Sequence, residues 1–253
     1  MGAGDFVWYD LMTTDTAAAI AFYARVVGWS TQDFPGEKGA YPMWVASQGP
    51  LGGVMLLPEE AAKMGAPPHW MSHVTVTDVD AAVAKVKALG GRVYQAPEAI
   101  PTVGRFAVIG DPQGAVISLF QPDAAMTPHD GAKHGEFCWS ELATKDPEAA
   151  LRFYGELLGW TLQTAMDMGP MGPYLIFGKD GRQRGGIFRM PPEMPMPGWM
   201  YYVQVDDLEA AVARAKEGGA HLIHGPSDVP GGRIAQLVDP QGAHFALHAT
   251  AAA

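Results

Sequence analysis

Short runs of apolar residues alternate along the chain with longer Ala-rich segments, and Gly and Pro residues separate them. Runs such as 6–12 and 73–77 are typical of strands, because β-branched and aromatic residues dominate them. Helices of about three turns are expected where apolar residues recur at helical spacing. These segments are 16–27, 79–89, 147–158 and 208–217. The pattern predicts a strand, a helix and three further strands, four times in succession.

Capping residues mark both ends of each expected helix. An Asp precedes every helix, where its carboxylate can accept backbone N–H bonds and complement the helix dipole. A Gly follows every helix and is expected to end it. The Asp residues are Asp15, Asp78, Asp146 and Asp207, and the Gly residues are Gly28, Gly91, Gly159 and Gly219.

The two halves of the chain are copies of each other. Residues 5–29 align without a gap on residues 136–160, with 11 identities in 25 positions that include the Phe-Tyr and Gly-Trp pairs. Residues 104–115 align on residues 232–243 with 8 identities in 12, including the string DPQG, which is expected to form a turn. Two such blocks in the same order indicate a duplication.

A fainter repeat within each half divides the chain into four similar parts, near residues 5–58, 69–122, 136–191 and 197–249. The stretch 122–133 contains Pro, Gly and Asp, lacks periodicity and is typical of a linker. The predicted organisation is one domain at 1–122, a linker at 123–133 and a second domain at 134–253.

Composition and charge narrow the classes of function. The net charge is −10, split evenly as −5 for residues 1–125 and −5 for residues 126–253. An evenly acidic chain argues against nucleic acid and anionic membrane as partners. A single cysteine, Cys138, excludes an internal disulfide, and neither a signal peptide nor a membrane-spanning run is visible. We expect a cytoplasmic protein, with secretion by a route without a signal peptide left open.

The combined motifs resemble the VOC superfamily, which groups glyoxalases, bleomycin-resistance proteins and extradiol dioxygenases. They are D-x(6)-FY-x(4)-GW around the first helix of each half, and DPQG before its last strand. The chain looks most similar to tandem glyoxalase-like proteins of actinobacteria, including mycobacterial culture-filtrate antigens and proteins labelled hydroxylases. The resemblance implies an α+β fold of four βαβββ units, with cup-shaped mixed sheets, helices on the outer face and a small-molecule ligand inside the cup. It also implies a monomer or a homodimer, because single-domain relatives assemble four such units as dimers.

The resemblance further implies two metal-ligand positions per repeat, one on the first strand and one on the last. Family metalloenzymes carry His, Gln or Glu there, since a divalent metal needs imidazole and carboxylate donors that converge from several strands. None of the eight positions here holds His, Gln, Asp or Glu. The residues are Trp8, Leu56, Met71, Ser118, Trp139, Arg189, Met200 and Ala246. We therefore expect no metal cofactor at these positions.

Strand alternation places other residues on the same face as these positions. The residues two places along the first strands are Asp10, His73, Glu141 and Tyr202, and His248 shares a face with Ala246 on the last strand. The candidate ligand-binding residues are Trp8, Asp10, Met71, His73, Ser118, Trp139, Glu141, Arg189, Tyr202 and His248. Each has a structural alternative: the tryptophans can fill a closed cup, the acids can bond backbone or Arg, and Arg189 can lie at an exposed strand end.

Three hypotheses follow for the function. The first is a metal-independent binder of a small, planar or aromatic ligand that stacks on Trp8 and Trp139. The second is a lyase or isomerase of glyoxalase type, with Asp10 or Glu141 as the general base. A displaced metal site that uses these acids, His73 and the C-terminal histidines belongs to this enzymatic class. The third is a structural role. The Met-rich segments 166–171 and 190–200 are expected to be loops that either cover the site or only connect strands.

Overall fold

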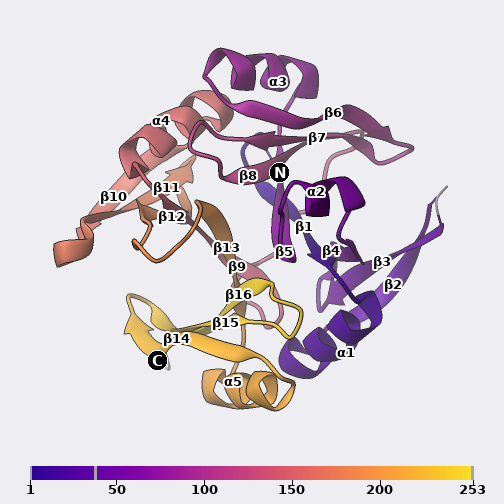
Figure 1. Ribbon diagram of the computed structural model, residues 1–253, viewed down its shortest axis with the longest axis vertical. Helices are drawn as coiled ribbons and strands as arrows, with labels where there is room; N and C mark the ends of the chain where they lie inside the picture. Colours follow the sequence, from indigo (N-terminus) through magenta and orange to yellow (C-terminus); the bar gives the residue numbers. More distant parts are fainter. Residues whose placement is uncertain (1, 37–38, 252–253) are drawn as a thin grey trace. The chain divides into compact units, whose positions relative to one another are not determined.

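The computed structural model describes residues 2–36 and 39–251. It confirms the α+β fold and the predicted fourfold βαβββ order (Figure 1). The first repeat comprises β1 (Phe6–Thr13), α1 (Thr16–Val27), β2 (Ser30–Gly36), β3 (Gly39–Ala46) and β4 (Gly49–Leu56). A short helix α2 (Glu59–Lys63) leads to the second repeat, which comprises β5 (His69–Thr75), α3 (Val79–Ala88), β6 (Arg92–Ile100), β7 (Gly104–Gly110) and β8 (Val116–Pro122).

The second half repeats this order. The third repeat comprises β9 (Phe137–Thr144), α4 (Pro147–Leu158), β10 (Thr161–Asp167), a 3₁₀ turn η1 (Gly169–Met171), β11 (Pro173–Lys179) and β12 (Arg182–Arg189). The fourth comprises β13 (Gly198–Gln204), α5 (Leu208–Glu217), β14 (His221–Val229), β15 (Gly232–Val238) and β16 (His244–Thr250). The strands form two eight-stranded mixed sheets, in the orders β2-β3-β4-β1-β5-β8-β7-β6 and β10-β11-β12-β9-β13-β16-β15-β14.

The helix caps follow the sequence prediction with one correction. Each of the four predicted Asp caps accepts a hydrogen bond from the backbone N–H three residues later, at 2.9–3.0 Å. Gly28 and Gly159 end their helices in the left-handed conformation, as expected. After α3, however, the residue with positive φ is Gly90 and not Gly91, because the helix already ends at Ala88 and Leu89 is its C-cap.

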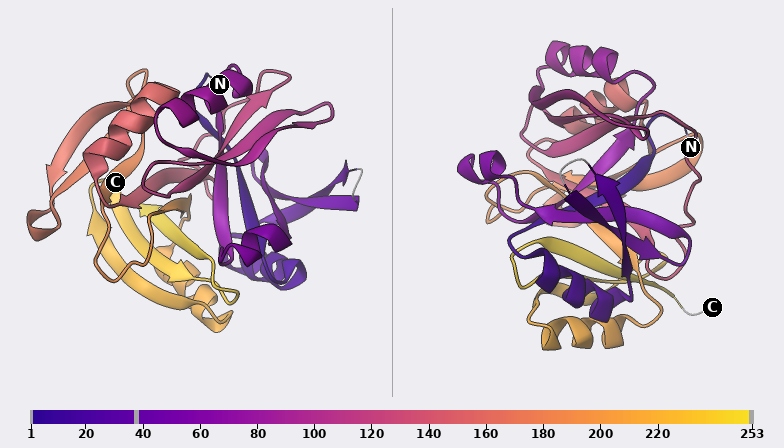
Figure 2. Two further views of the ribbon diagram at one scale, coloured as in Figure 1. Left: turned by 45° about the horizontal axis from the view of Figure 1, so that its top comes forward. Right: turned by 90° about the vertical axis from the view of Figure 1, so that its right-hand side faces the viewer.

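Packing groups the repeats differently from the chain order. One compact unit comprises residues 1–7, 72–128 and 139–200, and the other comprises residues 8–71, 129–138 and 201–253. The first compact unit therefore contains α3 and α4, and the second contains α1 and α5. Within each unit the two helices lie side by side (Figure 2). The predicted domain limits at residues 122 and 134 stay a prediction.

The duplicated motifs bond across the halves within each compact unit. In the second unit, the Tyr23 hydroxyl donates to Asp239 of the DPQG turn at 3.1 Å. In the first unit, the Tyr154 hydroxyl donates to Asp111 of the other DPQG turn at 3.3 Å. The predicted turn after Asp111 is confirmed, since Asp111 Oδ1 accepts hydrogen bonds from three backbone N–H groups. The Phe-Tyr and DPQG motifs are thus partners of one another.

The Gly-Trp pairs also bond one half of the chain to the other within each compact unit. The indole N–H of Trp29 donates to the carbonyl of Gly135 at 2.7 Å, and that of Trp160 donates to the carbonyl of Gly4 at 2.8 Å. A buried polar group without a partner would cost about 1–3 kcal/mol, so these buried bonds specify which segments pack together. Among the described residues, no helix is long and apolar enough to cross a membrane.

The hydrogen bonds between the two halves predict how the protein behaves after cleavage in the linker. A specific protease site inserted between Ala124 and Ala125, both exposed, allows cleavage of the folded protein in the linker. We expect the two fragments to co-elute at the size of the intact chain in native gel filtration, because each compact unit contains segments of both. Separate elution of the fragments without denaturant would contradict the finding that each compact unit contains segments of both halves.

Candidate functional site

The helices α1, α3, α4 and α5 each cover one face of the strands in their repeat. In the first compact unit α3 lies on β6, β7 and β8 (Figure 1), and its buried residues join a core with Val74, Ile117 and Leu119. Because strand side chains alternate, His73 and Ser118 lie on the opposite, helix-free face. The two are in register on β5 and β8.

Strand register defines one row of four residues across the helix-free face of every repeat. Each row starts on the first strand of the repeat and crosses its last strand toward the edge of the sheet. The rows are Asp10, Gly53, Met43 and Gln32; His73, Ser118, Val108 and Gln95; Glu141, Gly186, Ile176 and Thr164; and Tyr202, Ala246, Gln236 and His224. Register therefore makes Gly53 and Gly186, rather than Leu56 and Arg189, the counterparts of Ser118 and Ala246.

Asp10 belongs to a cluster of three hydrogen-bonded side chains in the second compact unit. The Trp8 indole N–H donates to Asp10 Oδ1 at 3.0 Å and lies 2.9 Å from the Tyr41 hydroxyl oxygen. The Tyr41 hydroxyl donates to the same carboxylate oxygen. Asp10 is buried, whereas the Trp8 ring is half-buried. The indole, the phenol and the carboxylate thus form one unit on the helix-free face.

The same cluster recurs around Glu141 in the first compact unit. The Trp139 indole N–H donates to the Tyr174 hydroxyl at 2.8 Å, and that hydroxyl donates to Glu141 Oε1 at 2.7 Å. The Tyr174 ring also stacks with Phe188, with ring centroids 6.1 Å apart. The structure therefore joins two predicted residues in each half through a tyrosine that the sequence reasoning missed.

The environment keeps both tyrosines protonated. Burial raises the pKa of Tyr41 above its ordinary value, and the negative charge of Asp10 raises it further. Burial and the charge of Glu141 raise the pKa of Tyr174 in the same way. Each phenol is accordingly a neutral hydrogen-bond donor to its carboxylate over the whole neutral and mildly alkaline range.

The remaining candidates on β5 and β8 lie in more apolar surroundings. His73 is buried, and its ring lies 6.1 Å from Phe106 and 6.3 Å from Phe120, between centroids. The Ser118 hydroxyl donates to the carbonyl of Ala107 at 3.3 Å. Met71 is buried on the strand that carries His73, although it belongs to the other compact unit.

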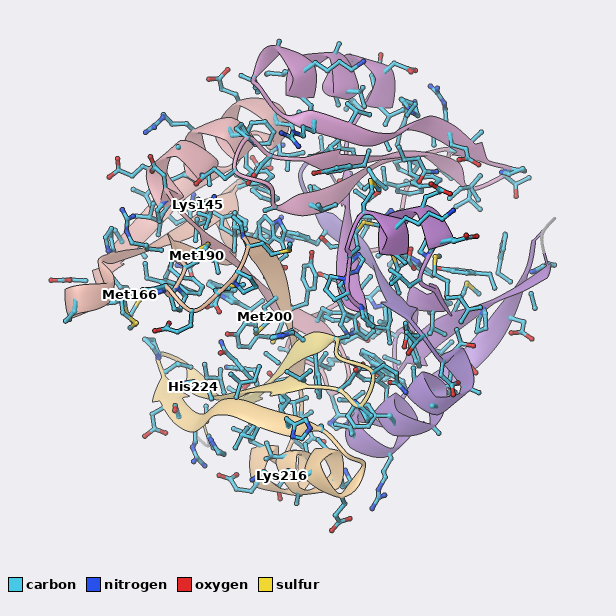
Figure 3. The ribbon with its side chains drawn as sticks, in the orientation of Figure 1. Lys145, Met166, Met190, Met200, Lys216 and His224 are labelled. Atoms are coloured by element: carbon cyan, nitrogen blue, oxygen red, sulfur yellow. The ribbon has the colours of Figure 1, made fainter. Side chains whose placement is uncertain are left out.

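The fourth repeat carries two further pairs of hydrogen-bonded polar side chains. The Gln236 amide donates to the Tyr202 hydroxyl at 2.7 Å, and His248 Nδ1 lies 2.6 Å from Gln204 Oε1. Burial lowers the pKa of His248. His224, labelled in Figure 3, is exposed and ends the row that contains Tyr202 and Gln236. Gln236 and His224 were not predicted, because their places depend on the register of β14 and β15.

Arg189 and the Met-rich segments lie at the ends of strands. Arg189 is exposed at the end of β12 and donates to the carbonyl of Lys145 at 2.8 Å. The expectation that these segments are loops throughout is wrong, because residues 166–167 end β10, residues 169–171 form η1 and residues 198–200 begin β13. Residues 190–197 connect β12 to β13. Met166, Met190 and Met200 are labelled in Figure 3.

The family model of the Glyoxalase/Bleomycin resistance protein/Dioxygenase superfamily matches residues 5–119 and 137–247. The chain belongs to this superfamily. It is 37% identical over 251 residues to "Putative glyoxylase CFP32" of Mycobacterium tuberculosis, covering 95% of this chain and 92% of the relative. It is 29% identical over 256 residues to "Anthracycline biosynthesis protein DnrV" of Streptomyces peucetius, covering 95% and 91%.

Two solved structures share the fold at low sequence identity. The Mn(II)-bound glyoxalase from Novosphingobium aromaticivorans matches with a TM-score of 0.63 at 19% identity, covering 98% of this chain and 81% of that one. The 2,3-dioxygenase LapB from Pseudomonas sp. KL28 matches with a TM-score of 0.66 at 14% identity, covering 100% and 94%. These similarities support the fold.

One of these structures is named as Mn(II)-bound, so the donor atoms of this chain can be compared with what a divalent metal needs. The register counterparts on the last strands are Gly53, Ser118, Gly186 and Ala246, which offer no imidazole or carboxylate. Asp10 Oδ1 and Glu141 Oε1 already accept bonds within their clusters. Among residues 2–36 and 39–251, no three His, Cys, Asp or Glu side chains are grouped as metal ligands. The donor set at these positions does not fit a divalent metal.

The raised pKa of the two phenols makes a prediction about alkaline titration. In the folded protein Tyr41 and Tyr174 stay protonated above pH 10, where tyrosines of the unfolded chain ionise, so stability falls as the pH rises through that range. The double variant Tyr41→Phe/Tyr174→Phe should leave the phenolate absorbance of the native protein below about pH 11 unchanged. A decrease equal to two tyrosines would show that these phenols ionise normally.

Proposed function

We propose that this VOC-superfamily protein binds a small planar aromatic molecule on the helix-free faces of its sheets, without a metal ion. The observation that carries the proposal is the duplicated cluster of Trp, Tyr and carboxylate, Trp8–Tyr41–Asp10 and Trp139–Tyr174–Glu141. A binding site for a small molecule typically combines apolar and aromatic walls with a few well-placed polar groups. Each cluster supplies both.

The half-buried indole rings provide the aromatic surface. Trp8 and Trp139 have their N–H groups bonded to protein oxygens, so their positions are fixed before a ligand arrives. A fixed aromatic ring loses little conformational entropy when a planar ligand stacks on it, which favours binding. The phenol and carboxylate oxygens beside each indole supply the polar contacts that orient the ligand.

The name of one relative supports the ligand class. DnrV is named an anthracycline biosynthesis protein, and an anthracycline contains a planar polycyclic ring system. That size and flatness suit stacking on an indole. We therefore take a planar polycyclic aromatic compound as the first ligand class to test.

The name of the other relative supports a second candidate function. CFP32 is named a glyoxylase, and Asp10 or Glu141 could act as the general base that takes a proton next to a carbonyl group. Incubation with the hemithioacetal of methylglyoxal and glutathione tests this activity. Thioester formation that is lost in Asp10→Asn or Glu141→Gln would support the enzyme over the binder.

Doxorubicin is a suitable fluorescent probe for the binding proposal. We expect wild-type protein to bind it, and Tyr41→Phe/Tyr174→Phe to weaken binding about 2- to 10-fold per site, the range for one lost hydrogen bond. Isothermal titration calorimetry measures both dissociation constants. Tyr94→Phe is the matched control, because it makes the same chemical change at an exposed tyrosine outside the clusters. No binding by the wild type would overturn this ligand class.

The proposal also predicts independence from divalent metals. Protein dialysed against EDTA should bind doxorubicin with the same dissociation constant as undialysed protein, and metal analysis should find no stoichiometric metal that resists the chelator. Loss of binding after dialysis, with recovery on addition of Zn²⁺ or Mn²⁺, would show that a metal site exists in this chain and would contradict the proposal.

A further inference from the structure

Two glycine pairs occupy equivalent positions in the two halves, Gly52-Gly53 on β4 and Gly185-Gly186 on β12. The first glycine of each pair allows two strands to approach. A Cβ on Gly52 would lie 2.0 Å from the backbone oxygen of Tyr9, and one on Gly185 would lie 1.8 Å from that of Ser140. Neither oxygen can move without moving its strand, so these two positions serve the fold.

The second glycine of each pair meets a tyrosine and not the backbone. A Cβ on Gly53 would lie 1.9 Å from the Tyr41 hydroxyl oxygen and 2.1 Å from the ring carbon that bears it. A Cβ on Gly186 would lie 2.0 Å from the corresponding ring carbon of Tyr174 and 2.1 Å from its hydroxyl oxygen. The three nearest atoms at each position all belong to that one tyrosine. Each phenol therefore packs directly on the Cα of a glycine.

This packing explains how the tyrosine reaches both of its partners. Gly53 is in register with Asp10, and Gly186 is in register with Glu141. A ring that packs on the glycine brings its hydroxyl next to the carboxylate on the adjacent strand and to the indole two residues earlier. An ordinary carbon contact needs 3.4 Å or more, so any side chain at the glycine would displace the phenol by more than 1 Å. Hydrogen bonds of 2.7–2.9 Å cannot survive such a displacement.

We infer that Gly53 and Gly186 are positioning residues of the two clusters, and that they set the depth at which Tyr41 and Tyr174 present their hydroxyls to a ligand. The inference rests on the proposed function for the ligand, but the placement of the tyrosines can be tested without one. In the second and fourth repeats the equivalent residues are Ser118 and Ala246, which carry side chains. The glycine is thus specific to the two repeats that contain the Trp–Tyr–carboxylate cluster.

The indole N–H resonances of protein labelled with ¹⁵N-tryptophan report on each cluster separately. The chain has seven Trp residues, and the variants Trp8→Phe and Trp139→Phe assign the two relevant signals. Gly53→Ala should shift the Trp8 signal and leave that of Trp139 in place, and Gly186→Ala should do the reverse. Gly198→Ala is the control, because its Cβ would meet only Met194 at an ordinary 3.7 Å. It should shift neither signal.

A double-mutant cycle covers the case in which Gly53→Ala folds poorly. Tyr41→Ala removes the ring that the new methyl group would meet, so Gly53→Ala should lower the melting temperature much less in the Tyr41→Ala background than in the wild type. Gly52→Ala is the matched comparison, since its clash is with backbone and should not be relieved by Tyr41→Ala. Equal effects of Gly53→Ala in both backgrounds would overturn the inference.

The ligand experiment separates this inference from the proposed function. Gly53→Ala and Gly186→Ala should each weaken doxorubicin binding to the affected cluster at least as much as the corresponding Tyr→Phe change, by about 10-fold for one lost, well-placed hydrogen bond. Gly53→Ala could shift only the Trp8 signal and Gly186→Ala only the Trp139 signal while the protein binds no doxorubicin. That result would support the positioning role and overturn the proposed ligand. An unchanged Trp8 signal in folded Gly53→Ala would overturn the positioning role.

Discussion

Side chains on a strand alternate between its two faces, and in each repeat a helix packs on only one of these faces. The apolar residues beside Asp10 and Glu141, among them Leu11 and Leu142, are fully buried. The residues in between must therefore lie on the helix-free face. A carboxylate that is buried there is costly unless donors bond it. Trp8 and Tyr41 supply those donors to Asp10, and Tyr174 supplies one to Glu141. The alternation of the strands thus fixes where the polar clusters form and why each acid has an aromatic donor beside it.

The strongest similarity between the halves has a structural cause. The Phe-Tyr, Gly-Trp and DPQG motifs bond each half to the other within the compact units, through pairs such as Tyr23 with Asp239 and Tyr154 with Asp111. These motifs hold the two halves of the chain together within each compact unit, and they carry little information about a ligand. The helix-free faces show both similarity and difference. The Trp and Tyr recur, whereas the acid changes from Asp10 to Glu141, which gives the two clusters the same chemistry with a different reach.

Much of the fold could be predicted because its signals are local. An Asp before an Ala-rich segment, a Gly after it and the DPQG turn each depend on a few adjacent residues, and the helices begin where Asp15, Asp78, Asp146 and Asp207 predict. Tyr41 and Tyr174 were missed because they lie on β3 and β11, whose pairing with β4 and β12 cannot be read from either strand alone. A signal was nevertheless present: in each half a Gly-x-Tyr string precedes a Gly-Gly pair, and the tyrosine lies 12 residues before its second glycine. The repeat pattern along the sequence predicts Leu56 and Arg189 as the counterparts of Ser118 and Ala246, whereas strand register gives Gly53 and Gly186.

The proposed ligand lies beside Trp8 and Trp139 on the helix-free faces. The most direct measurement is a titration of wild-type protein, labelled with ¹⁵N-tryptophan, with doxorubicin while the indole N–H signals are recorded. Trp44 and Trp160 are buried in the cores of their compact units and provide internal references. We expect the signals of Trp8 and Trp139 to move with increasing ligand while those of Trp44 and Trp160 stay in place. Saturation of the protein with doxorubicin without movement of either the Trp8 or the Trp139 signal would contradict the proposal.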